Sequence, residues 1–279
     1  AMSRATRVPR PRKVEYDETD VGGVRAIVAT PKDTDARCHV LYLHGGGYVI
    51  GSPETHLTMC GRLARTVPAI VTVPDYRLAP EHPYPAAIDD AVAAYRDLAA
   101  RVDPSRIAIA GDSAGGGATL ATLCALRDAG DPLPACAWLL SPWTDLTESG
   151  ESIRTKADID PMIKVGAISE AANMYAGDTP LDDGGVSPLF ADLDGLPPML
   201  IQTGIDEVLL SDSTRLAERL TRAGVYNELD LAEHMWHVYP MFAGYMPEAD
   251  EALQHASRFI KSNTLVLTPA VETMDAGPV

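Results

Sequence analysis

One stretch constrains this chain more than any other: residues 111–117 read Gly-Asp-Ser-Ala-Gly-Gly-Gly. An apolar run at residues 107–110 precedes it, and a helix-forming run at residues 118–127 follows it. The sequence therefore predicts a strand, a tight turn and a helix in succession. Small residues around Ser113 suit a sharp turn, because larger side chains would collide with the flanking strand and helix. In this setting the pattern Gly-x-Ser-x-Gly is typical of a serine that acts as a nucleophile.

A second glycine-rich stretch, His-Gly-Gly-Gly-Tyr at residues 44–48, follows the apolar run at residues 39–43. Three consecutive glycines at the end of a strand leave backbone N–H groups uncovered and able to approach a ligand. Preformed N–H donors of this kind stabilise the negative charge that develops on oxygen during acyl transfer. The stretch therefore indicates an oxyanion hole.

The order of apolar and helix-forming runs predicts the fold class. Between residues 38 and 262, strand-like runs alternate with helix-like runs, which is typical of a mostly parallel sheet with helices on both faces. Ahead of this region, Gly22-Gly23 predicts a hairpin between two short strands within residues 14–30. The alternation breaks at residues 143–188, which we interpret as a cap over the carboxyl edge of the sheet, with a long surface loop as the alternative. We expect a single α/β domain over residues 1–279.

Composition narrows the classes of partner. The net charge of −16 and the pI near 4.7 argue against nucleic acid and anionic membranes, since both attract basic surfaces. No apolar run reaches membrane-spanning length and no signal-peptide pattern is found, so we expect a cytoplasmic protein without stable membrane insertion. The four cysteines form no C-x-x-C pair and suit buried free thiols in a reducing compartment. Residues 263–279 lack periodicity and are expected to form a flexible tail.

A serine hydroxyl needs a general base to become a nucleophile, and that base needs a third group to orient it. In a sheet of this kind the acid follows the serine in the chain and the histidine follows the acid. His237 fits this order, because it comes just after the last predicted strand at residues 225–231. His234 is the main alternative, while other histidines such as His56 are expected at the surface or at helix caps. The spacing His234-x-x-His237 lacks a third ligand for zinc, and we expect no metal or organic cofactor.

Asp206 is the favoured acid, because it follows the strand predicted at residues 198–203 and lies at the same edge of the sheet. Glu207 is the first alternative, but its side chain would point to the other side if the backbone stayed extended. Asp212 is the second alternative, although it looks like the N-cap of the next helix.

Six motifs together resemble the hormone-sensitive-lipase-like esterases, the bacterial group IV carboxylesterases of the α/β-hydrolase fold. The motifs lie at residues 44–48 (HGGGY), 76–83 (YRLAPEHP), 111–116 (GDSAGG), 187–203 (SPLFADLDGLPPMLIQT), 206–210 (DEVLL) and 234–239 (HMWHVY). The resemblance implies a small cap built from approximately residues 1–20 and from the insertion at residues 143–188. One departure is Val238, at a position where the family often has glycine.

The resemblance also implies roles for individual residues. It implies a catalytic triad of Ser113, Asp206 and His237, and an oxyanion hole formed by the N–H groups of Gly46, Gly47 and Ala114. Asp112 and residues 76–83 would support this site. Five side chains are further expected near the substrate, with ordinary core packing as the alternative for the apolar ones: Tyr48, Asp112, Trp143, Leu209 and Trp236.

The chemistry that follows is two-step acyl transfer from a short- to medium-chain carboxylic ester to water. His237 would deprotonate Ser113, the hydroxyl would attack the ester carbonyl, and water would then release the acyl group. A lactone or amide hydrolase with the same triad is the main alternative, and a non-catalytic ligand-binding relative is another. The resemblance also implies a homodimer through the edge of the last strand, with a covered edge as the alternative.

Overall fold

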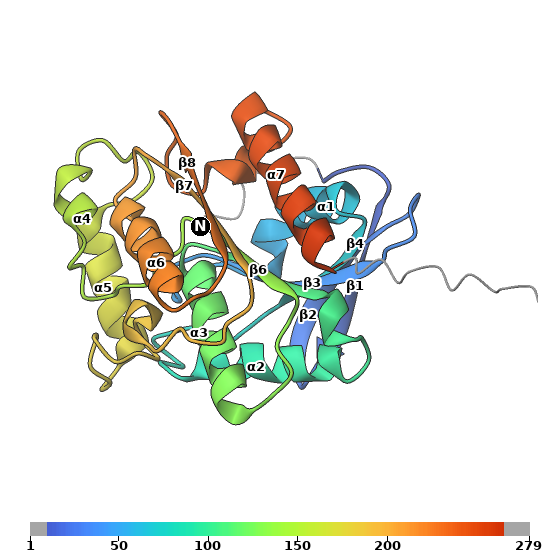
Figure 1. The fold of residues 1–279 in the computed structure, drawn as a ribbon, viewed down its shortest axis with the longest axis horizontal. Coiled ribbons are helices and arrows are strands. Elements are labelled where there is room, and N and C mark those ends of the chain that lie inside the picture. Colours follow the sequence, from blue (N-terminus) through green and yellow to red (C-terminus); the bar gives the residue numbers. More distant parts are fainter. Residues whose placement is uncertain (1–9, 265–279) are drawn as a thin grey trace, which may run out of the picture.

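The computed structural model describes residues 10–264, and an eight-stranded sheet runs through the middle of this part of the chain (Figure 1). The strand order is β1-β2-β4-β3-β5-β6-β7-β8. Strands β3 to β8 run parallel to one another, while β2 runs antiparallel to both β1 and β4. The strands are β1 Val14–Val21, β2 Val24–Pro31, β3 Cys38–Leu43, β4 Ala69–Pro74, β5 Ile107–Asp112, β6 Cys136–Leu140, β7 Met199–Gly204 and β8 Asn227–Ala232.

Helices cover both faces of the sheet, as Figure 1 shows. Helices α1 and α7 pack on one face, and α2, α3 and α6 pack on the other. The helices are α1 Pro53–Thr66, α2 Ala86–Ala99, α3 Ala114–Ala129, α4 Glu151–Thr155, α5 Val165–Ala176, α6 Leu210–Arg222 and α7 Pro247–Thr264, with short 3₁₀ helices η1 Pro104–Arg106, η2 Pro188–Phe190 and η3 Tyr239–Phe242. The predicted α/β class is confirmed.

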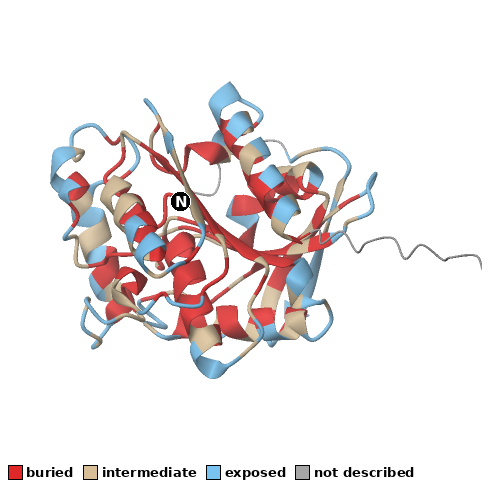
Figure 2. Ribbon diagram, viewed as in Figure 1, coloured by how far each residue is buried: buried red, intermediate tan, exposed pale blue. Residues whose placement is uncertain are grey.

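The sheet separates two apolar cores, and its central strands are buried on both sides (Figure 2). In β3, Leu41 and Leu43 face the core beneath α2 and α3, whereas Val40 and Tyr42 face the core beneath α1 and α7. This alternation follows from the two-residue period of a strand. Burial on both faces explains why these strands are apolar throughout.

The amino-terminal region differs from one expectation. The predicted hairpin is confirmed, because Val14–Val21 pairs with Val24–Pro31 through a turn at Gly22-Gly23. Residues 14–20 therefore belong to the main sheet and not to a cap, since their backbone groups are used in strand pairing. The expected cap contribution of residues 1–9 and the expected tail beyond residue 264 lie outside the described residues.

The insertion after β6 contains two helices, α4 and α5, which lie at the same end of the molecule as α6 (Figure 1). It is thus a structured segment and not only a surface loop. The four cysteines are free and buried, as predicted: Cys38, Cys60, Cys124 and Cys136. None of the helices within residues 10–264 combines the length and the apolar character needed to cross a membrane.

Candidate active site

Ser113 occupies a strained turn between β5 and α3. Its φ of 53° and ψ of −122° are rare for a residue with a side chain. The turn is fixed on both sides, because the N–H of Ser113 donates to the carbonyl of Leu140 at 2.8 Å and its own carbonyl accepts the N–H of Trp143 at 2.9 Å. A Cβ at Gly115 would lie 2.0 Å from the carbonyl oxygen of Leu43. Only glycine at this position lets the elbow approach the neighbouring strand so closely.

The glycine loop at residues 44–47 lies directly beside this elbow. Gly46 has a φ of +130°, and a Cβ there would lie 2.0 Å from the carbonyl oxygen of Ile50, so the loop conformation requires glycine. Among the hydrogen bonds of residues 10–264, none uses the N–H of Gly46 or Gly47 as donor. Ala114 begins α3, so its N–H has no partner within that helix. None of the three predicted oxyanion donors therefore gives its N–H to another group within residues 10–264.

A buried ion pair holds the glycine loop in place. The Asp112 carboxylate accepts the N–H of Gly45 at 3.0 Å and the hydroxyl of Tyr42 at 2.9 Å, and it lies 3.3 Å from Nε2 of His56. Burial alone would raise the pKa of Asp112, but the His56 cation and the hydrogen bonds outweigh it and lower that pKa. Burial likewise acts to lower the pKa of His56, and the Asp112 charge reverses the shift and raises it.

Two expectations change with this pair. Asp112 was expected near the substrate, but it is only 3% exposed and its carboxylate contacts Tyr42, the glycine loop and His56. His56 is buried and paired, whereas a surface or capping position was expected.

The segment at residues 76–83 contacts the same loop, as the resemblance implies. The Tyr76 hydroxyl donates to the carbonyl of His44 at 2.5 Å, and their rings stack with centroids 4.2 Å apart. The N–H of Ala79 donates to the carbonyl of Tyr48 at 2.9 Å. The irregular segment therefore fixes both ends of the glycine loop.

His237 lies in the loop after β8, where it is 6% exposed. Its Nδ1 lies 3.5 Å from Oε1 of Glu207. The rival histidine, His234, is exposed and has a φ of +61°. Of the two histidines, His237 is therefore the one whose ring is held by a buried carboxylate.

The carboxylate beside His237 belongs to Glu207, which differs from the favoured assignment of Asp206. Glu207 is fully buried, and its Oε2 accepts the Ser141 hydroxyl at 2.8 Å and the N–H of Gly204 at 3.0 Å. Asp206 instead forms an ion pair with Lys156, Nζ to Oδ1 3.3 Å. The reason is local geometry: β7 ends at Gly204 and the chain turns at once, so the assumption of an extended backbone fails.

The cap insertion is anchored to the loop that carries Glu207. The Asp160 carboxylate, 1% exposed, accepts the N–H groups of Val208, Met162 and Ile163 at 2.8 to 3.0 Å. The Lys156–Asp206 ion pair joins the same two segments. The insertion and the loop that carries Asp206, Glu207 and Val208 therefore form one connected unit.

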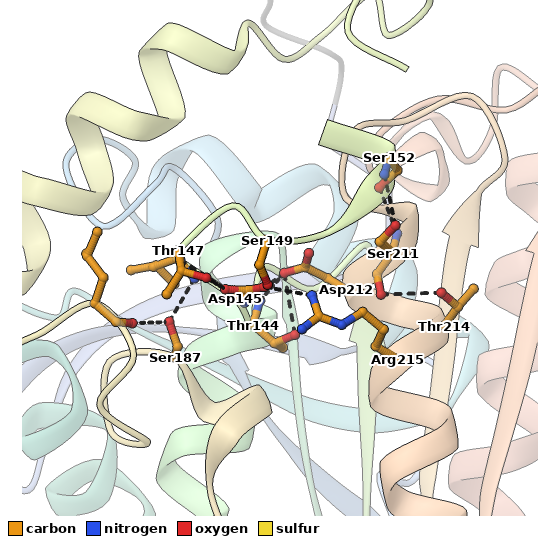
Figure 3. A network of polar contacts seen from close by, with 12 residues as sticks. Thr144, Asp145, Thr147, Ser149, Ser152, Ser187, Ser211, Asp212, Thr214 and Arg215 are labelled. Carbon is orange, nitrogen blue, oxygen red and sulfur yellow. Dashed lines mark hydrogen bonds and ion pairs between the residues drawn. The ribbon is translucent and has the colours of Figure 1, made fainter. Parts of the chain in front are cut away.

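A polar network joins the start of the insertion to α6 (Figure 3). The Asp212 carboxylate accepts the N–H groups of Thr144 and Asp145 at 2.7 and 2.8 Å, and Arg215 donates to Asp145 at 2.7 Å. Burial raises the pKa of Asp212 to about 7, against the opposing effect of these hydrogen bonds. Asp212 is not the N-cap of α6, because that position belongs to Leu209.

The predicted pocket side chains are mostly core. Tyr48 stacks on Tyr175 with ring centroids 3.7 Å apart, and Trp143 packs against Tyr48. These rings and Leu209 are each about 1% exposed. Trp236 is half-buried and packs edge-on against Phe242. Three of the exposed large apolar side chains lie in the segments that follow the glycine loop, Asp160 and His237: Ile50, Met162 and Phe242.

Ser141 and Asp160 were not among the site residues predicted from the sequence. Ser141 had one signal, since it is the polar residue that ends an apolar strand at the edge carrying Ser113. No sequence signal pointed to Asp160, because the insertion contains many acidic residues and only the folded structure distinguishes this one. Among residues 10–264, no group of three or more His, Cys, Asp or Glu side chains is placed to hold a metal ion.

Comparisons with known proteins fit this geometry. A family model described as the alpha/beta hydrolase fold matches residues 40–241. An acetyl-hydrolase of Streptomyces hygroscopicus is 37% identical over 270 residues, which covers 91% of this chain and 90% of that protein. The carboxylesterase NlhH of Mycobacterium tuberculosis is 41% identical over 223 residues, covering 76% of this chain and 70% of that protein.

Solved structures are similar over nearly the whole described chain. A hormone-sensitive lipase from a metagenome library has a TM-score of 0.91 and 44% identity, covering 93% of this chain and 87% of that one. The esterase EstE5, in a crystal soaked with p-nitrophenyl butyrate, has a TM-score of 0.88 and 41% identity, covering 92% and 87%.

Proposed function

The chain is a carboxylic ester hydrolase of the hormone-sensitive-lipase-like family within the α/β-hydrolase fold, and on this premise we propose that Ser113, His237 and Glu207 form its catalytic triad. The observation that carries the proposal is the strained backbone of Ser113 at the start of α3. Strain of this kind persists where the surrounding structure maintains it, and it is concentrated at functional sites.

The three triad residues come from turns at the carboxyl ends of β5, β7 and β8. In an open α/β sheet, ligands bind at this edge. His237 takes the proton from Ser113 as its oxygen attacks the ester carbonyl, and then gives that proton to the leaving alcohol. Glu207 keeps Nδ1 of His237 protonated and stabilises the cation that forms. Water, activated by the same histidine, then releases the acid and restores Ser113.

The oxyanion hole proposed for this reaction consists of the N–H groups of Gly46, Gly47 and Ala114. Their freedom from other hydrogen bonds supports this role, as does the support of the loop by Asp112 and Tyr76. Donors that are already in place need no rearrangement when charge develops on the carbonyl oxygen.

For the substrate, we propose carboxylic esters with a short to medium acyl chain. Ile50, Met162 and Phe242 are exposed apolar side chains in the segments that follow the glycine loop, Asp160 and His237, and would offer contacts to an alkyl group bound there. Two similar proteins are named an acetyl-hydrolase and an esterase soaked with p-nitrophenyl butyrate, and both names refer to small acyl groups. Lactones and amides are alternative substrates, because they react through the same tetrahedral intermediate.

The test compares the wild-type chain with Ser113→Ala on p-nitrophenyl esters of increasing acyl length, a lactone and an anilide. We expect hydrolysis to be fastest on acyl chains of about two to eight carbons. The kcat of Ser113→Ala should be at least about a thousandfold lower than that of the wild type. Circular dichroism and the thermal midpoint check that the variant is folded. Full activity of folded Ser113→Ala would refute Ser113 as the nucleophile. A preference for the lactone or the anilide would refute carboxylic esters as the substrate class.

The homodimer and the cytoplasmic location stay predictions. β8 lies at the edge of the sheet, and Leu231 within it and Tyr226 just before it are exposed, which is compatible with a homodimer through this strand. A cytoplasmic location is compatible with the four free cysteines.

A further inference from the structure

Ser141 lies between the two loops that carry the acid and the base. It follows the last residue of β6 and is fully buried. Its hydroxyl donates to Oε2 of Glu207 at 2.8 Å and accepts the N–H of Val238 at 3.0 Å. Its own N–H donates to the carbonyl of Gln202 at 2.7 Å, which ties it to β7. One side chain thus contacts the acid directly and the residue that follows His237.

The backbone at both ends of this link is strained. Ser141 has a φ of +43° and Val238 a φ of +54°, in the left-handed region that glycine adopts most easily. A β-branched residue such as Val238 is a marked exception there. The hydrogen bond from the N–H of Val238 to Ser141 holds this conformation, and the conformation sets the direction in which His237 leaves the loop.

We propose that Ser141 is a positioning residue for catalysis, which rests on the proposed triad. A hydroxyl can donate and accept at once, so it can fix one oxygen of Glu207 and the backbone after His237 together. With Oε2 held by Ser141 and Gly204, Oε1 of Glu207 is directed at Nδ1 of His237. The charge of Glu207 is then in place before His237 takes up a proton.

A purely structural serine is available for comparison. Ser187 is also fully buried, and its hydroxyl donates to the carbonyl of Leu181 at 2.6 Å and accepts the N–H of Leu146 at 2.8 Å. It matches Ser141 in burial and in the number of hydrogen bonds, and it lies in the network of Figure 3 without contacting the triad. Ser187→Ala therefore reports the effect of losing a buried hydroxyl as such.

The experiment measures kcat, KM and the thermal midpoint on a short p-nitrophenyl ester. We expect Ser141→Ala to lower kcat by about 10- to 100-fold with KM changed by less than about threefold, because a hydrogen bond to a charged group is lost. Ser187→Ala should lower the thermal midpoint and leave kcat within about twofold. Equal kcat values for Ser141→Ala and Ser187→Ala would overturn the proposal.

Ser141→Gly separates the hydroxyl from the strain, because glycine accepts the positive φ and lacks the oxygen. It should be as slow as Ser141→Ala, and it remains informative if the alanine variant does not fold. Wild-type kcat in Ser141→Gly would overturn the proposal.

A double-mutant cycle tests whether Ser141 acts through the acid. In the Glu207→Gln background, adding Ser141→Ala should lower kcat by less than about threefold further, since the carboxylate that it orients is gone. Additive losses would mean that Ser141 acts elsewhere. Activity that survives in Ser113→Ala would instead refute the triad itself, so the two failures are distinguishable.

Discussion

The carboxylate of Glu207 lies 3.5 Å from Nδ1 of His237, and the other oxygen of Glu207 is held by Ser141 and the N–H of Gly204. The contact is longer than an ordinary charge-assisted hydrogen bond, which measures about 2.7–2.9 Å. Such bonds are often long without substrate and shorten when the histidine takes up a proton. Because Glu207 is fully buried, its interaction with an imidazolium is weakly screened by solvent.

The two neighbouring acids should differ sharply when each is neutralised. We expect Glu207→Gln to lower kcat by about 10³- to 10⁴-fold, because it removes the charge that stabilises the His237 cation. Asp206→Asn removes only a partly exposed ion pair with Lys156 and should change kcat by less than about fivefold. Steady-state kinetics on a short p-nitrophenyl ester measures both, with circular dichroism as the folding control. A larger loss in Asp206→Asn would restore Asp206 as the acid.

The two histidines of the last loop form a second comparison. His237→Ala should lower kcat at least about a thousandfold, because the general base is lost. His234→Ala should stay within about twofold, since its side chain is exposed and no carboxylate holds it. The same assay and folding control apply, and the reverse ranking would show that His234 is the base.

Gly46 tests the oxyanion hole. Gly46→Ala places a Cβ 2.0 Å from the carbonyl oxygen of Ile50, so the loop must shift and its N–H groups turn away. We expect kcat to fall about 10²- to 10³-fold, as for the loss of one oxyanion donor. Gly166→Ala in α5 is the matched control, because a Cβ there meets nothing within 4 Å. Unchanged kcat in Gly46→Ala would contradict the assignment.

Asp212 should make the stability of the enzyme depend on pH. Its folded-state pKa is raised by burial to about 7, while in the unfolded chain it is near 4. Between these values the native state binds the extra proton, so its stabilising effect is full below about pH 4 and is lost as the pH rises through 7. Between pH 5 and pH 8 the free energy of unfolding of the wild type should therefore fall relative to that of Asp212→Asn.

Urea denaturation at the two pH values measures this difference. Other titrating groups, such as the His56–Asp112 pair, are present in both proteins and cancel in the comparison. A difference in unfolding free energy that stays constant with pH would contradict a proton-linked role for Asp212.

Much of the fold could be predicted because its signals are local. Glycines at 46 and 115 are required by positive φ or by close backbone approach, and such demands appear directly in the sequence. The alternation of strands and helices predicted the sheet, and the hairpin at Gly22-Gly23 was correctly placed. The order of serine, acid and histidine narrowed the candidates to a few residues.

The pairings within the site were not local, and the sequence left them undetermined. Glu207 and not Asp206 faces His237 because the chain turns immediately after Gly204, which depends on packing against the following helix and the cap. Tertiary contacts alone join His56 to Asp112, and Asp160 to the N–H of Val208 next to Glu207.

The sequence by itself therefore determined that Ser113 sits on a glycine-flanked turn beside a glycine loop, because backbone conformation limits which residues can occupy such turns. The tertiary structure decided which carboxylate lies beside His237 and which buried hydroxyl holds that carboxylate. Those choices depend on side-chain directions that are set by contacts between segments up to about a hundred residues apart, such as Ser141 and Val238.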